Sequence, residues 1–187
     1  MIDEKTLMQY SYKFQDIRQL EKDYLLALLL YEIYNEFDDE LIFKGGTSLK
    51  YFYNLNRFSE DLDFSYISKK NSLNTIYAKM NRAFKHVNLQ YDILSTEHRG
   101  HKIRDNVVGI NFEIRIKGPL YNKLNYMENI DIELSLRNDD ILPPDIKYLV
   151  PFYPDIPMFP VPVMSLNEII SEKVASISER DKMRDNI

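Results

Sequence analysis

The chain has 187 residues and a formal net charge of −5, with 44% hydrophobic and 28% charged residues. This composition is typical of a folded globular protein and excludes wholesale disorder. The chain has no cysteine, which excludes disulfides, thiolate metal sites and cysteine nucleophiles. Bulk basicity is excluded as well, so nucleic acid would have to bind a local patch. The longest apolar run, Leu25 to Tyr31, is shorter than the ~20 residues of a membrane span. No signal peptide is evident, so we expect a cytoplasmic protein with no membrane association.

The first third of the chain predicts alternating helices and short strands. Apolar residues recur at helical spacing in the first segment, and acidic and apolar residues alternate in the last one. The expected elements are a helix over 17–37, a strand at 41–43, a helix containing Leu49, Phe52 and Tyr53, and a strand at 60–66.

The rest of the chain predicts one further helix, three strands and a C-terminal helix. The expected elements are a helix capped by Asn71 or Ser72 and ending near His86, strands near 89–96, 107–117 and 127–137, and a helix opened by the capping box Ser165-Leu166-Asn167-Glu168. Seven of the eight prolines lie between Pro143 and Pro162, which predicts an extended connector that is neither a helix nor a central strand.

This irregular alternation of elements predicts an α+β fold, in which helices cover a mixed sheet. We expect one main unit over residues 1–164 and the beginning of a helical region over 165–187.

The first candidate site motif is the glycine pair Gly45-Gly46, followed by Thr47 and Ser48. Glycines between a strand and a helix let the backbone approach a ligand, and free amides at the start of a helix favour an anion such as phosphate. Alone, the motif is equally compatible with a plain strand-to-helix turn.

The second motif is Arg57-Phe58-Ser59-Glu60-Asp61-Leu62-Asp63-Phe64. Residues i and i+2 of a strand share a face, so Asp61 and Asp63 point the same way while Leu62 and Phe64 enter the core. Two carboxylates on one face suit Mg²⁺, although a solvated strand face would have the same pattern.

Together, these two motifs resemble the nucleotidyltransferase superfamily that includes DNA polymerase β. More closely, they resemble the AbiEii/AbiGii toxin family of bacterial toxin–antitoxin systems. The resemblance rests on Gly45-Gly46-Thr47-Ser48-Leu49 and on the segment from Arg57 to Phe64. It implies the polymerase β-like fold and a nucleotidyl transfer of the EC 2.7.7 type, in which NMP moves from an NTP to an acceptor.

The resemblance also implies roles for individual residues. Gly45, Gly46, Thr47 and Ser48 would hold phosphate, and Arg57 and Ser59 would contact the triphosphate. Asp61 and Asp63 would bind two Mg²⁺ ions, with Mn²⁺ as a possible substitute, and the two ions would clamp the attacking and leaving oxygens.

A third carboxylate is expected on a neighbouring strand. The segment 129–137 has an apolar face and a polar face, and the polar face carries both Asp131 and Glu133. The family pattern favours Glu133, whereas the superfamily habit favours Asp131. Periodicity leaves both open as metal ligand or general base.

The C-terminal helix is expected to bury a stripe containing Leu166, Ile169, Ile170 and Ile177, with Lys173 in its middle. A lysine there either snorkels or meets an anion. The family pattern resembles Glu172-Lys173-Val174-Ala175, Arg180 and Arg184-Asp185. It implies that Lys173 contacts the triphosphate or assists proton transfer and that Asp185 belongs to the site. Related proteins continue with a further helical domain, so we expect a truncated or reduced form here.

The family implies an RNA acceptor, the 3′ end of tRNA, whose modification would block translation, and a cognate antitoxin as protein partner. Two alternatives stay open, namely NMP transfer to a protein hydroxyl and a catalytically degenerate nucleotide-binding or interaction module. Two basic segments could follow an RNA backbone or simply be solvated: the helix near Lys79 to His86 and a loop from His98 to Arg104.

Overall fold

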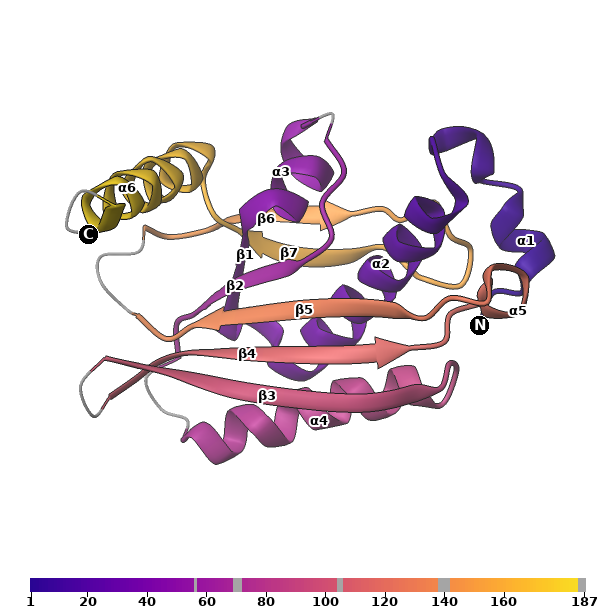
Figure 1. Ribbon diagram of the computed structural model, residues 1–187, viewed down its shortest axis with the longest axis horizontal. Helices are drawn as coiled ribbons and strands as arrows, with labels where there is room; N and C mark the ends of the chain where they lie inside the picture. The colour runs from indigo at the N-terminus through magenta and orange to yellow at the C-terminus, as the bar shows by residue number, and fades with distance from the viewer. Residues whose placement is uncertain (56, 69–71, 104–105, 138–141, 185–187) are drawn as a thin grey trace.

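The computed structural model describes residues 1–55, 57–68, 72–103, 106–137 and 142–184, and these form a seven-stranded mixed sheet packed against helices (Figure 1). The strand order is β3-β4-β5-β2-β1-β7-β6. The strands are β1 (Leu41–Lys44), β2 (Leu62–Tyr66), β3 (Ile93–Ile103), β4 (Asn106–Ile116), β5 (Glu128–Ser135), β6 (Asp145–Leu149) and β7 (Phe159–Val163). This architecture confirms the predicted α+β class.

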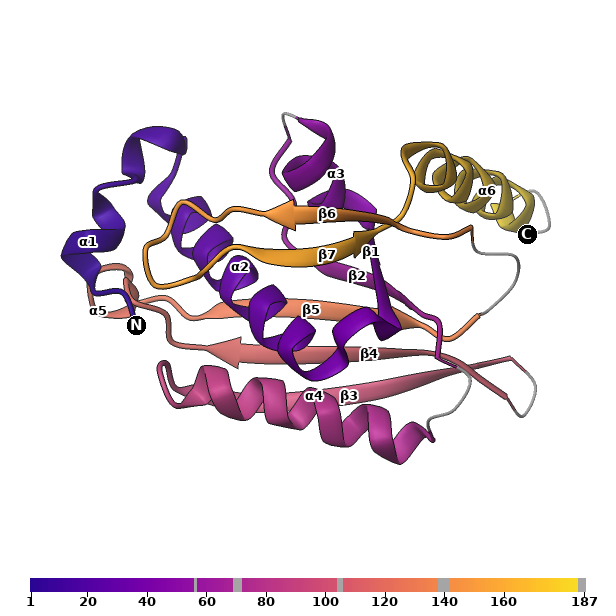
Figure 2. The same cartoon turned by 180° about the vertical axis from the view of Figure 1, so that it is seen from behind.

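The helices differ widely in length and in what they cover. They are α1 (Glu4–Met8), α2 (Ile17–Phe37), α3 (Gly45–Tyr53), α4 (Leu73–Asn88), α5 (Tyr121–Leu124) and α6 (Leu166–Arg184), with 3-10 helices η1 (Ser11–Lys13) and η2 (Asp38–Glu40). Figure 2 shows α2 and α4 in front of the sheet on one face. Helices α3 and α6 lie beside the half of the sheet that contains β1, β7 and β6. In Figure 1, no described helix covers the opposite face of β5 and β4.

The long helix α2 forms the centre of the core. Its bounds agree with the predicted helix, and the Asp16 side chain caps it by accepting from the Arg18 amide. Burial extends around the whole helix between Leu20 and Leu30, including the charged residues in between. Helix α4 packs against α2, and Tyr34 of α2 packs on Phe64 of β2 and Phe159 of β7. Within the described ranges, none of the helices combines the length and apolarity needed to cross a bilayer.

The proline-rich segment differs from its prediction. It contains strands β6 and β7, and β7 is an interior strand although it carries Pro160 and Pro162. The two prolines are two residues apart, so their missing N–H groups point to the same side of the strand. The Pro162 carbonyl lies 3.4 Å from the Tyr34 hydroxyl, and β7 pairs with β1 only at Phe43 and Val163. The side of β7 that lacks these N–H donors therefore faces β1, with which it pairs at a single position. This is why an interior strand can contain the two prolines.

The prediction of a basic loop from His98 to Arg104 was also wrong. Residues from His98 to Ile103 belong to β3, which pairs with β4 in a long hairpin, and Arg104 lies outside the described residues. The strand expected at 89–96 therefore begins later, at Ile93, because Leu89 still caps α4. The side chain that caps the start of α4 is Ser72, whereas Asn71 lies outside the described residues.

Candidate active site

The turn between β1 and α3 brings the glycine pair against an acidic side chain. Gly45 has a φ of +74°, a conformation that glycine adopts at little cost. A Cβ atom at Gly45 would lie 1.8 Å from the Asp63 Oδ2 atom, and one at Gly46 would lie 2.6 Å from the Ser59 Oγ atom. The glycines thus allow Asp63 and Ser59 to lie directly on the turn.

The two hydroxyl residues that follow are buried and make local hydrogen bonds. The Thr47 hydroxyl donates to the Asp61 carbonyl oxygen at 2.6 Å, and the Ser48 hydroxyl donates to the Gly45 carbonyl oxygen at 3.3 Å. Thr47 therefore ties the start of α3 to the chain entering β2. Both side chains support the turn, and only the backbone amides at the start of α3 remain for an anion.

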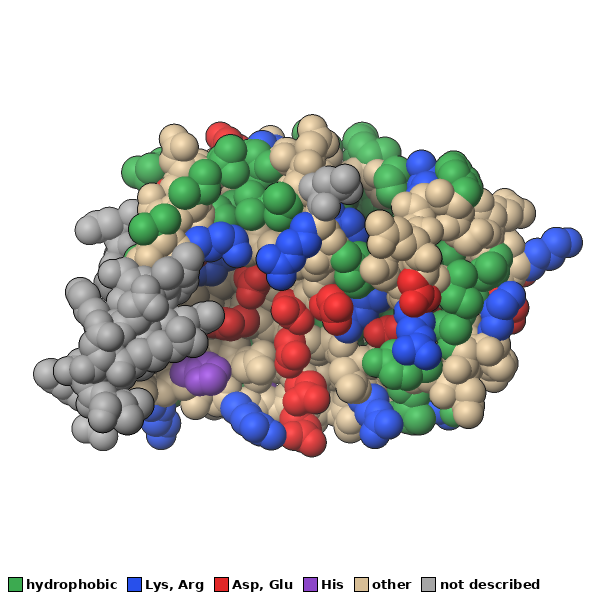
Figure 3. All heavy atoms as spheres, turned by 45° about the horizontal axis from the view of Figure 1, so that its top comes forward, with side chains coloured by type: hydrophobic (Ala, Val, Ile, Leu, Met, Phe, Trp, Pro, Cys, Tyr) green, Lys and Arg blue, Asp and Glu red, His purple; other side chains and the backbone are tan. Residues whose placement is uncertain are grey.

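Strands β2 and β5 bring the predicted acids together. The two strands are parallel, and their register places Asp63 beside Glu133. The apolar residues Leu62, Phe64, Ile132 and Leu134, which alternate with the acids, are fully buried beneath them. The acids therefore share the open face of the sheet, where Figure 3 shows a line of acidic side chains.

Both candidates for the third carboxylate lie on this face. Glu133 faces Asp63, and Asp131 is the acid with the largest electrostatic effect on Asp61. Asp131 also accepts a 3.5 Å hydrogen bond from the Asn111 amide of β4. The structure thus forms two pairs of acids on this face, Asp63 with Glu133 and Asp61 with Asp131.

This crowding changes the ionisation of the acids. Burial raises the pKa of Asp63 to about 6, and the neighbouring carboxylates of Glu133 and Asp61 add to the shift. Lys44 and Lys173 act in the opposite direction on the same pKa. The pKa of Asp61 is also raised, first by partial burial and then by Asp131. The nearby lysines therefore only partly offset the effect of burial and of the neighbouring carboxylates on the pKa of Asp63.

A cavity of about 220 Å³ lies beside these acids, between the end of β1 and α6. Lys44 and Lys173 line it together with Asp63 and Glu133. The Lys44 ammonium pairs with Glu172 of α6, at 2.9 and 3.1 Å from the two carboxylate oxygens. Neither Lys44 nor Glu172 was predicted as a site residue, although they are the immediate neighbours of Gly45 and Lys173. Adjacency to a motif residue was the signal that could have found them.

Helix α6 brings Lys173 to the wall of the cavity beside the acids, but Lys173 is exposed rather than part of a buried stripe. Ser165 and Glu168 form the predicted capping box, with the Ser165 hydroxyl 2.7 Å from the Glu168 carboxylate. Ile169 is buried, whereas Leu166 and Ile170 are 40% and 49% exposed, so the stripe prediction was wrong for these two. Among the described side chains of α6, Ile169 is the one that packs into a buried apolar cluster, with Ile42, Leu49 and Met164. The side chains of Ile177, Arg180 and Arg184, and all of Asp185, lie outside the described residues.

Arg57 does not join this group. It lines a different cavity, together with Lys50 and Phe58, whereas Ser59 lies against Gly46. Of the residues predicted to contact the triphosphate, Ser59 and Lys173 are therefore beside the acids and Arg57 is beside α3.

Comparison with known proteins agrees with this arrangement. The sequence model of the family described as nucleotidyl transferase AbiEii toxin, type IV toxin–antitoxin system, matches residues 28–187. The chain belongs to the AbiEii family. No curated protein matches the sequence.

Two solved structures from Helicobacter pylori share the fold of this AbiEii member. One is described as a candidate nucleotidyltransferase, with 20% identity and a TM-score of 0.55 over 84% of this chain and 58% of its own. The other is JHP933, with 20% identity and a TM-score of 0.53 over 84% of this chain and 56% of its own. The present chain therefore spans little more than half the length of these neighbours.

The donor atoms of this AbiEii site suit a hard divalent cation. Within the described part of the chain, no three His, Asp or Glu side chains stand together as a ready-made metal site. However, the carboxylates of Asp61, Asp63, Asp131 and Glu133 share one face, and oxygen ligands are those that Mg²⁺ prefers. Because burial and the neighbouring carboxylates raise the pKa of Asp61 and Asp63, a cation among these acids would relieve the repulsion.

Asp63 is expected to make the protein less stable as pH rises. Its folded pKa of about 6 is above the unfolded value, so the native state binds more protons in this range. The free energy of unfolding should therefore fall by up to about 3 kcal/mol between about pH 4 and pH 7. Urea denaturation in EDTA, compared with Asp63→Asn, isolates this contribution. Parallel pH curves for the two proteins would contradict the assignment.

Proposed function

We propose that this chain carries the catalytic centre of a metal-dependent nucleotidyltransferase that transfers NMP from an NTP to an RNA acceptor, the 3′ end of tRNA. This would block translation in the cytoplasm, and a cognate antitoxin would be the protein partner. The observation that carries the proposal is the register of β2 and β5, which places Asp63 and Glu133 together beside the glycine turn.

Each group in the site has a role in this proposal. Asp61, Asp63 and either Glu133 or Asp131 would hold Mg²⁺ or Mn²⁺, which would supply the charge neutralisation that phosphoryl chemistry needs. The backbone at Gly45 and Gly46 and the Ser59 hydroxyl would hold phosphate oxygens. Lys173 and Lys44 line the adjoining cavity, where they would stabilise charge on the triphosphate.

The transfer itself forms one bond and breaks one bond. An acceptor hydroxyl oxygen attacks the α-phosphorus, and the bond between that phosphorus and the α–β bridging oxygen breaks to release pyrophosphate. The proton of the hydroxyl passes to a carboxylate of the site or to water. Whichever of Glu133 and Asp131 does not hold the cation would be the general base for this proton.

The test incubates the full-length protein with each labelled NTP, Mg²⁺ and total RNA. We expect label on RNA of tRNA size, and we expect Asp61→Ala to abolish it. Label on a protein band would instead indicate transfer to a protein hydroxyl. NTP binding by calorimetry without turnover would indicate a degenerate binding module, and either result would overturn the proposal.

A further inference from the structure

A separate recess lies beside α3, and none of the residues that line it lines the cavity of Asp63. It consists of two adjoining cavities of about 500 and 390 Å³, which share Lys13, Phe14 and Lys50. Its walls come from η1, α2, α3, the segment after β6 and the segment before β2. We call this recess the α3 groove, lined chiefly by Lys13, Phe14, Lys50, Arg57, Phe58 and Phe152.

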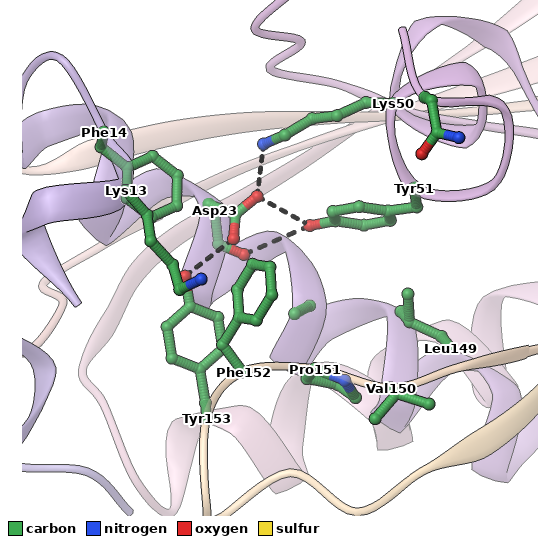
Figure 4. Close-up of a pocket in the computed structure, with 12 residues that line it drawn as sticks. Lys13, Phe14, Asp23, Lys50, Tyr51, Leu149, Val150, Pro151, Phe152 and Tyr153 are labelled. Atoms are coloured by element: carbon green, nitrogen blue, oxygen red, sulfur yellow. Dashed lines mark hydrogen bonds and ion pairs between the residues drawn. The ribbon is translucent and has the colours of Figure 1, made fainter. Parts of the chain in front are cut away.

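Aromatic rings and cations alternate along the groove. Phe152 is 54% exposed, and the Lys13 ammonium lies 4.4 Å from the centre of its ring. The Lys50 ammonium lies 4.8 Å from the centre of the Phe58 ring. Figure 4 shows how Phe14 and Phe152 come from separate segments to the same cavity. The exposed ring of Phe152 thus lies next to positive charge, with the half-buried rings of Phe14 and Phe58 beside it.

The one acid that lines the groove is already neutralised. Asp23 is 3% exposed, pairs with Lys50, and accepts hydrogen bonds from the hydroxyls of Tyr153 at 2.7 Å and Tyr51 at 3.2 Å (Figure 4). By contrast, Lys13 and Arg57 have no carboxylate at ion-pair distance among the described residues. The groove is therefore locally positive on a chain whose net charge is −5.

We infer that the α3 groove binds single-stranded RNA and guides the acceptor end towards the acids; the guiding role rests on the proposed function. The exposed ring of Phe152 can stack an unpaired base, and the cations of Lys13 and Arg57 suit the neighbouring phosphates. A duplex would not fit this chemistry, because its bases are already stacked against one another.

The path of the chain connects the groove to the candidate active site. Arg57 and Phe58 line the groove, and the next residue, Ser59, lies against Gly46. Asp61 follows four residues after Arg57, a separation of at most about 14 Å along the chain. An RNA end bound in the groove is therefore within a few nucleotides of the acids.

The experiment measures the binding of a fluorescent single-stranded RNA oligonucleotide by anisotropy, without NTP or metal, over a range of salt concentrations. Phe152→Ala should weaken binding by about 5- to 100-fold, because it removes one stacking face. Lys13→Ala and Arg57→Ala should each lower the salt slope by about one. Leu89→Ala and Lys5→Ala are the matched controls, since both side chains are exposed and neither lines the groove, and they should bind like the wild type. Thermal melting confirms that every variant is folded.

Three results would overturn the inference: no RNA binding by the wild type, groove variants that bind RNA like the controls, or groove variants that lose NTP binding and keep RNA binding. The outcome is separable from that of the transfer assay. If the wild type transfers NMP and the groove variants still bind RNA normally, the RNA-binding role of the groove is refuted and the proposed function stands. If the groove variants lose RNA binding but the wild type transfers no NMP to RNA, the proposed function is refuted and RNA binding by the groove stands.

Discussion

Replacing Asp63 by asparagine is expected to lower NMP transfer by about 10³-fold or more while leaving the fold intact. The carboxylate lies on the glycine turn and beside Glu133, where it would ligate the cation. Asparagine has nearly the same shape but carries no charge. Because burial and neighbouring acids already raise the pKa of Asp63 to about 6, losing its charge removes repulsion at pH 7. The variant should therefore be at least as stable as the wild type without metal.

Two measurements check this expectation together. Label transfer to RNA gives the rate, and thermal unfolding with and without Mg²⁺ gives the stability. Mg²⁺ should stabilise the wild type more than the variant, because only the wild type retains the ligand. Asp145→Asn, at an exposed strand start, is the matched control and should resemble the wild type in both assays. Transfer by Asp63→Asn within about tenfold of the wild type would refute the role of Asp63.

Replacing Gly45 by alanine should damage both stability and transfer. The backbone at Gly45 has a φ of +74°, and the added methyl group would lie 1.8 Å from the Asp63 Oδ2 atom. The backbone strain should lower the free energy of unfolding by about 1–3 kcal/mol. The Asp63 carboxylate must move away, and a displacement of about 1 Å at a reacting centre costs about 10²-fold in rate.

Gly100→Ala separates these effects from a general loss of glycine. Gly100 lies in β3, and the nearest heavy atom to an added Cβ is 3.6 Å away, which is an ordinary contact. Its free energy of unfolding should change by no more than about 0.5 kcal/mol. Chemical denaturation and the transfer assay compare both variants with the wild type. Equal behaviour of the two would show that the geometry at Gly45 is not required.

Local patterns predicted the elements that lie next to the site. The helix over 17–37 has apolar residues at helical spacing and a capping aspartate, and the alternation of Leu62 and Phe64 with acids identifies β2. The turn at Gly45 followed from glycine chemistry. These features depend on neighbours in the chain, and sequence patterns report such dependence directly.

Features set by distant partners could not be predicted in the same way. Which of Asp131 and Glu133 faces Asp63 depends on the register of β2 against β5, and periodicity alone leaves this open because both acids share a face. The interior position of β7 depends on the sparse pairing with β1 that its prolines allow. The exposure of Ile170 and the position of Arg57 likewise depend on which surfaces pack beside them.

The parallel pairing of β2 with β5 has a consequence for synthesis of the protein in the cell. Asp63 and Glu133 are 70 residues apart, and Lys173 comes a further 40 residues later. A nascent chain that has released only the glycine turn and β2 from the ribosome holds half of the acids and no helix α6. On the proposed function, such a chain could not yet modify tRNA, because its site is incomplete. On the proposed function, transfer would become possible only after β5 and α6 have left the ribosome and packed beside β2 in the folded site.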